Sequence, residues 1–216
     1  WGRNPMKLNS EYFGILVLLL ALLLVPEMKQ RPFALFMGLL FAFALAYALG
    51  PHTPVHWIFY HLLPGVKVLR TPGMIAFLFA FPACVLAGLG LDRVLRSTAE
   101  EGEIFGRRLL ITGGILTGIA LLLALAPKAV TDGWISVFYP DIVSQKRQIL
   151  ADGYGWLARG ALYVALVAGA GTTLLYLRVR QQLGTGLLLV GLCALSLFDT
   201  WRIDRLFLQY EEPAQQ

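Results

Sequence analysis

Charged side chains are scarce in this sequence. Only 14% of its 216 residues are Asp, Glu, Lys or Arg, whereas an ordinary soluble domain has about 25%. Hydrophobic residues make up 57% of the chain. Because so few charges cannot cover a water-exposed surface, the composition excludes a soluble globular domain and predicts an integral membrane protein.

The usual chemical motifs are also missing. The two cysteines, Cys84 and Cys193, each lie inside an apolar run, which excludes a disulfide framework and favours a role as small packing residues. His52 and His56 have the spacing of a zinc-binding helix, but Pro54 lies between them and no partner glutamate follows His52. We therefore expect interfacial histidines, His61 included, and no metal site. No cofactor is evident, since a phosphate-binding glycine loop and a nucleophile elbow are absent.

Six apolar runs predict an all-α, polytopic membrane bundle with about six transmembrane helices. We expect the helices at about 10–25, 32–49, 72–95, 108–126, 156–176 and 186–200. A short aromatic stretch at 52–65 cannot cross a bilayer and predicts an interfacial helix before the third span. Residues 1–210 then form one transmembrane module, and we expect the polar tail at 211–216 to continue into a further domain.

Three local patterns refine this arrangement. Pro82 lies in the middle of the third span and predicts a kink there. Gly114 and Gly118 have the small-xxx-small spacing that lets helix backbones approach, so we expect their face to pack against another helix. Residues 127–155 are interpreted as the longest loop.

The distribution of Lys and Arg predicts an orientation. The connections at 26–31, 92–108 and 177–185 carry eight cations in 32 residues, whereas the segments on the other side carry nine in 77 residues. Because the denser and shorter side faces the cytoplasm, both termini are expected on the outer face of a bacterial inner membrane. These cations account for the net charge of +5, so we expect membrane lipids as partners and no nucleic acid.

Three cations are candidates for binding a lipid phosphate. Arg70 and Lys67 precede the third span, where the chain meets water and where an arginine can bind a phosphate through two parallel hydrogen bonds. An ordinary anchor to the lipid headgroups is the other interpretation of Arg70. Arg159 lies just inside the fifth span, which makes it either a functional residue or one that extends to the headgroups.

The carboxylates give no clear candidate for a functional site. The acidic residues between the fourth and fifth spans are expected to be solvated and not catalytic; they are Asp132, Asp141 and Asp152. Asp199 and Arg202 are three residues apart and are expected to pair at the outer end of the sixth span. The amino-acid pattern therefore does not identify any catalytic residue.

The order of several features resembles a known family. The features are YFGIL at 12–16, LPG at 63–65, LRTP at 69–72, LAGLGLD at 86–92 and Asp199. In this order they resemble the later membrane part of bacterial YfhO-type proteins, which belong to the polytopic glycosyltransferases that use lipid-linked phosphosugars. The resemblance implies transfer of a sugar from a polyprenyl-phosphate carrier on the outer face, with the catalytic base in an earlier part of a longer protein.

Two other classes stay open. Met74 stands near the place where family members often carry a second arginine, which favours a non-catalytic membrane subunit that packs in a larger complex of membrane proteins. A transporter is the third alternative, but it would need ionisable residues near the middle of the membrane.

Overall fold

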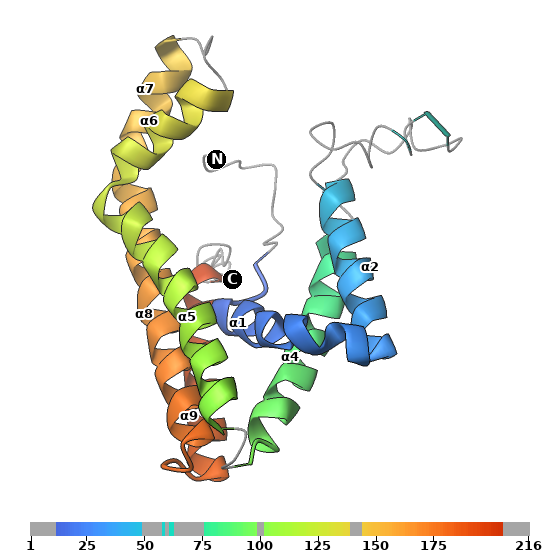
Figure 1. Cartoon of the computed structure of the whole chain (residues 1–216). Coiled ribbons are helices and arrows are strands. Elements are labelled where there is room, and N and C mark those ends of the chain that lie inside the picture. Colours follow the sequence, from blue (N-terminus) through green and yellow to red (C-terminus); the bar gives the residue numbers. More distant parts are fainter. Residues whose placement is uncertain are drawn as a thin grey trace, which may run out of the picture. The chain divides into compact units, whose positions relative to one another are not determined.

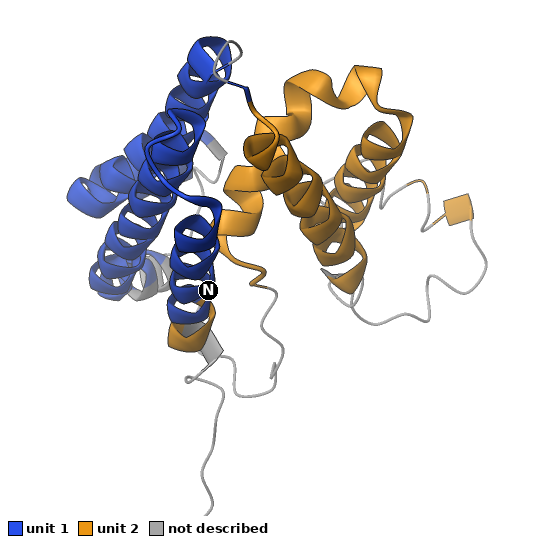
Figure 2. Cartoon of the chain, turned by 90° about the horizontal axis from the view of Figure 1, so that it is seen from below, with its two compact units in different colours: residues 1–8, 98–199 blue, residues 9–97, 200–216 orange. Residues whose placement is uncertain are grey.

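The computed structural model describes residues 12–48, 58, 61–62, 76–98, 102–138 and 144–204. These residues form helices and connections and contain no strand, which confirms the predicted all-α class. The chain divides into two compact units, which Figure 2 colours separately: unit 1 holds residues 1–8 and 98–199, and unit 2 holds residues 9–97 and 200–216. Each unit is described by itself.

The helices follow the apolar runs closely (Figure 1). In chain order they are α1 (Ile15–Leu24), the 3-10 helix η1 (Val25–Gln30), α2 (Pro32–Ala48), α4 (Ala76–Leu95), α5 (Gly102–Leu125), α6 (Pro127–Phe138), α7 (Ser144–Asp152), α8 (Tyr154–Val179) and α9 (Thr185–Asp204).

Four of the described helices are long and apolar enough to cross a membrane. They are Phe77–Leu95, Gly102–Leu125, Tyr154–Val179 and Thr185–Arg202. The predicted count of six is not confirmed, because α2 has only 17 residues and α1 only 10. At 1.5 Å per residue α1 is about 15 Å long, half the thickness of a bilayer core.

Two regions differ from the sequence-based expectation or fall outside the structure. Residues 127–155 are not an irregular loop, since α6 and α7 occupy most of them. Of the predicted interfacial segment, only Ile58, His61 and Leu62 are described, and each is helical and exposed. His52, His56 and the tail at 211–216 lie outside the described residues.

Unit 2 is built on the close approach of α4 to α1 and α2. Gly90 of α4 touches the backbone of Leu20 in α1 so closely that a Cβ at position 90 would overlap the Leu20 carbonyl group. At the other end of these helices, Phe13, Phe41 and Phe79 form a three-membered aromatic cluster with ring centroids 6.0 to 6.5 Å apart. Edge-to-face rings of this kind stabilise a contact beyond the area they bury.

The α1–α2 hairpin turns at Pro26, because proline at the end of α1 cannot continue its hydrogen-bond ladder. The turn is the 3-10 helix η1, and Met28 from it packs on a core of Ala21, Leu24, Ala34, Met37 and Leu86. Pro82 lies inside α4 and is buried, and the helix continues through it. The kink that was expected at Pro82 stays a prediction.

Unit 1 is centred on α8, which packs against α5 on one side and α9 on another. Gly102 of α5 lies against Val179 of α8, whereas Gly113 lies against Thr172. As the residue number rises along α5, the number of its contact residue in α8 falls. Helices α5 and α8 are therefore antiparallel neighbours (Figure 1). On α9, Gly191 lies against Leu174 of α8.

The predicted packing face of α5 is wrong. Gly114 and Gly118 are exposed, and nothing lies within 4 Å of a Cβ built on either residue. The buried small residues of α5 are instead Gly102, Gly106, Gly113 and Ala120. A Cβ at Gly113 would overlap the side chain of Thr172, whose hydroxyl donates to the Ala168 carbonyl oxygen at 2.7 Å.

We predict that Gly113→Ala destabilises unit 1 by about 1–3 kcal/mol, because the added methyl group must displace a β-branched side chain that has few alternative rotamers. Gly114→Ala is the matched control, since it adds the same group to open space and removes a helix glycine, which favours the helix by about 0.5–1 kcal/mol. Thermal unfolding of both variants in detergent micelles measures the difference. Equal unfolding temperatures for the two variants would contradict the packing described here.

Candidate functional site

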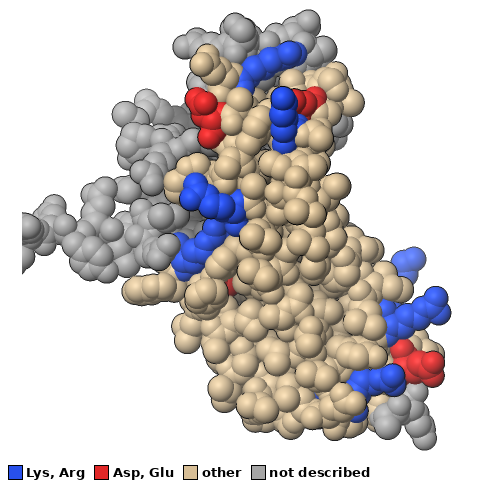
Figure 3. Space-filling view, turned by 90° about the vertical axis from the view of Figure 1, so that its left-hand side faces the viewer, with Lys and Arg blue, Asp and Glu red and all other residues tan. Residues whose placement is uncertain are grey.

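The described charged side chains lie toward the ends of the long helices. Lys, Arg, Asp and Glu gather in the upper part of the face in Figure 3 and again near its lower right, and a broad uncharged surface separates them. A charge in the middle of a bilayer is costly, so this distribution fits helices that cross a membrane. The candidate sites are therefore at the helix ends.

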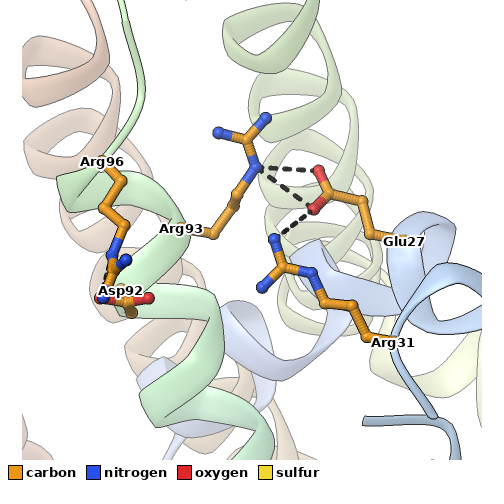
Figure 4. A network of polar contacts seen from close by, with 5 residues as sticks. All are labelled: Glu27, Arg31, Asp92, Arg93 and Arg96. Carbon is orange, nitrogen blue, oxygen red and sulfur yellow. Dashed lines mark hydrogen bonds and ion pairs between the residues drawn. The ribbon is translucent and has the colours of Figure 1, made fainter.

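One end of unit 2 carries a network centred on Glu27 (Figure 4). Arg93, in the last turn of α4, donates from Nε to both carboxylate oxygens of Glu27, at 3.1 and 3.2 Å. Arg31, which directly precedes α2, donates from an Nη atom to the same carboxylate at 3.2 Å. The Glu27 side chain is only 15% exposed and that of Arg93 19%, so a carboxylate on the α1–α2 turn ties α4 to the hairpin.

The network differs from the neighbouring ion pair on α4. Arg96, which directly follows α4, donates to Asp92 at 2.8 Å, but both side chains are exposed and lie only four residues apart, so their pairing joins no second element. Sequence reasoning treated Arg31 and Arg93 only as topology signals and did not find the partner that they share. The one available signal was Glu27, the single acidic residue in the connection at 26–31.

We predict that Glu27→Gln lowers the free energy of unfolding by about 1–3 kcal/mol, because it leaves two half-buried guanidinium groups beside each other without a carboxylate. Asp92→Asn is the control, and its exposed pair should change stability by about 0.5 kcal/mol or less. Denaturant or thermal unfolding in micelles measures both effects. A Glu27→Gln protein as stable as the Asp92→Asn protein would show that the network does not hold the two elements together.

The beginning of α8 presents a second polar cluster. Arg159 is exposed, donates from Nε to the Gly155 carbonyl oxygen at 3.1 Å, and lies with its guanidinium carbon 5.0 Å from the centre of the Trp156 ring. No carboxylate among the described residues forms an ion pair with it. Its contacts with the described residues therefore use Nε and the flat face of the guanidinium group.

Helices α6 and α8 are tied together beside this arginine. The Tyr154 hydroxyl donates to Oδ1 of Asp132 at 2.9 Å. Asp132 therefore lies on a helix and accepts a hydrogen bond from another helix, and it is not a solvated loop carboxylate. Asp152, at the end of α7, is exposed as expected, and Asp141 lies outside the described residues.

The opposite end of α8 carries a similar arginine, Arg180, which contacts a tyrosine in place of a tryptophan. Arg180 lies over the Tyr176 ring at 5.6 Å, and its Nε donates to the Tyr176 hydroxyl at 3.2 Å. Because α5 and α8 are antiparallel, Arg107 and Arg108 near the start of α5 lie at this same end. Arg107, Arg108, Arg178 and Arg180 thus gather at one end of unit 1. Arg159 lies toward the other end, where α6 and α7 carry Lys128 and Arg147.

Several predicted residues take other positions or are not described. Arg70 and Lys67 lie outside the described residues, so their role as phosphate-binding residues stays a prediction. Cys84 and Cys193 are exposed, so the expectation that they pack inside the chain is wrong. Asp199 is buried at 2% exposure, and its pairing with Arg202 stays a prediction.

The remaining possibility, a metal centre, finds no support in the described part of the chain, where no three His, Cys, Asp or Glu side chains are grouped. No family model, curated protein or solved structure matches this chain. Arg159, with its contacts to Gly155 and Trp156, is therefore the candidate site of unit 1.

Proposed function

We propose that the chain is the membrane-embedded part of a glycosyltransferase-like protein, and that Arg159 holds the phosphate of a polyprenyl-phosphate sugar donor. The observation that carries this proposal is the geometry of Arg159. Its Nε is used by a backbone carbonyl group and its flat face by Trp156. These contacts fix the guanidinium group in place and leave the edge that carries both Nη atoms for two oxygens of a phosphate.

The depth of Arg159 suits a lipid headgroup. It lies in the second turn of α8, five residues after the first residue of that helix. Tryptophan and arginine near a helix end occupy the level where a membrane meets water, which is also the level of a lipid phosphate. A phosphate bound there keeps its polyprenyl chain among the apolar side chains that α8 exposes farther along, such as Leu162 and Leu166.

The cations of unit 1 support an outer position for Arg159. Arg107, Arg108, Arg178 and Arg180 belong to the end of the α5–α8 pair that we assign to the cytoplasm by the density of positive charge. Arg159 is then on the outer side. Arg70 and Lys67 are further phosphate candidates from the sequence, and the base that activates the acceptor is assigned to another part of the protein.

The role proposed for Arg159 is electrostatic. When the sugar leaves its carrier, negative charge builds up on the departing phosphate, and a fixed cation stabilises that charge more in the transition state than in the ground state. The residue needs no proton transfer of its own for this task. The same group also positions the donor relative to the membrane surface.

A non-catalytic membrane subunit is the second candidate, and a different observation favours it. Polar contacts between separate elements, such as Glu27 with Arg93, Asp132 with Tyr154 and Tyr163 with the Phe198 carbonyl oxygen, pair groups of this chain with one another. Such contacts hold a scaffold together and use no substrate. In that case Arg159 anchors α8 to ordinary headgroups.

Binding of a labelled polyprenyl phosphate to the purified protein in micelles tests the proposal. We expect Arg159→Ala to weaken binding by about 10-fold or more, since a charge-assisted hydrogen bond contributes about 1.5–3 kcal/mol. Arg159→Lys should also weaken it, because lysine presents no planar pair of donors and does not stack on Trp156 in the same way. Arg180→Ala is the matched control, because it removes a similar arginine–aromatic stack from the other end of the same helix.

Two further probes separate the candidates. Polyprenol without phosphate should bind weakly, and phosphatidylglycerol should not displace the polyprenyl phosphate. Unchanged binding in Arg159→Ala would overturn the role of this residue. Equal binding of polyprenyl phosphate and phosphatidylglycerol would instead support a scaffold anchored to ordinary lipids.

A further inference from the structure

We infer that α6 is an interfacial helix whose Trp134 and Val137 insert into the boundary between the lipid headgroups and the acyl chains. Trp134 is 60% exposed and Val137 71% exposed. The residues lie three apart on a helix and so share one face. Both side chains are large, apolar and more than half exposed.

The opposite face of α6 is polar. Lys128, Asp132 and Ser136 are four residues apart in turn, which places them along one stripe of the helix. Asp132 on this stripe accepts a hydrogen bond from Tyr154 at the start of α8. Buried Ile135, beside this stripe, and the hydrogen bond of Asp132 mark the side of α6 that contacts the rest of unit 1, whereas Trp134 and Val137 lie on the other side of the helix. A helix with one apolar and one polar face is the kind that lies in a membrane interface.

The position of α6 in the chain puts this face at the membrane surface. Helix α5 is one of the four candidate spans, and its last residue, Leu125, is 83% exposed. Pro127 begins α6 only two residues later. Helix α6 therefore starts directly at the end of a candidate membrane span. The hydrogen bond from Tyr154 ties α6 to the first residue of another candidate span.

The neighbouring helix α7 shows why lipid is the expected occupant and a protein partner is not. Its sequence, SQKRQILAD, has no tryptophan and exposes Arg147 and Gln148. Of the two short helices at this end of unit 1, α6 alone carries an exposed tryptophan, and α6 is the one that directly continues a membrane span. Tryptophan is enriched at the membrane–water interface because its ring is apolar and its N–H needs a polar partner. Lys128 on the polar face can reach the lipid phosphates.

Fluorescence quenching in liposomes tests this inference. The whole chain keeps Trp134 as its single tryptophan, with the other four replaced by phenylalanine, and is reconstituted with lipids brominated either near the headgroup or near the end of the acyl chain. We expect blue-shifted emission, and we expect quenching several-fold stronger with the shallow bromines than with the deep ones. Aqueous iodide should quench weakly.

The matched control moves the tryptophan to α7, as Gln148→Trp in a chain that also carries Trp134→Phe. Its emission should be quenched by iodide and little affected by either brominated lipid. If the single-tryptophan protein does not fold, Trp134→Cys and Gln148→Cys replace the pair, each in a chain that also carries Cys84→Ala and Cys193→Ala, since both native cysteines are exposed. A water-soluble maleimide should then modify only the cysteine at 148. Iodide quenching or maleimide labelling at 134 as strong as at 148 would overturn the inference, and protection without quenching by lipid would indicate a protein partner or a second copy.

Discussion

Close helix packing at glycine residues stabilises each of the two units of this protein. Gly113 brings α5 against Thr172 of α8, and Gly90 brings α4 against the backbone of Leu20 in α1. In a membrane this kind of contact matters more than in water, because lipid tails are as apolar as leucine side chains and give helices no hydrophobic reason to associate. Association then depends on van der Waals contact, which is greatest where nothing keeps the backbones apart.

The same constraint explains where the polar groups are. A hydroxyl group inside the membrane needs a partner, and Thr172 finds one in the carbonyl oxygen one turn earlier, so it can lie beside Gly113 without an unsatisfied hydrogen bond. Full charges are kept to the helix ends. There Glu27 joins Arg31 and Arg93 across the α1–α2 turn, where partial exposure reduces the cost of burying an ion pair.

The two ends of α8 show how one side-chain arrangement can serve two purposes. Arg159 lies over Trp156 and Arg180 lies over Tyr176, and both rings hold their guanidinium groups by similar contacts. Arg180 lies at the same end of unit 1 as Arg107, Arg108 and Arg178, which is the end that we propose to face the cytoplasm. Arg159 has α6 for a neighbour, tied to α8 by Tyr154 and Asp132. In our proposals a lipid phosphate and an interfacial helix therefore meet at the same end of unit 1.

The sequence by itself determined the helical class and the approximate limits of the four long spans. An apolar run of about 20 residues must satisfy every backbone hydrogen bond internally, and only a helix does so in lipid. Only the tertiary structure decided which helix faces pack. Gly114 and Gly118 have the favoured spacing, yet α8 packs on Gly113, because protein and lipid are equally apolar and the pattern of hydrophobic residues does not distinguish an inner from an outer face. The pairing of Glu27 with Arg93, 66 residues away, was likewise beyond the sequence, since it depends on where α4 returns to the hairpin.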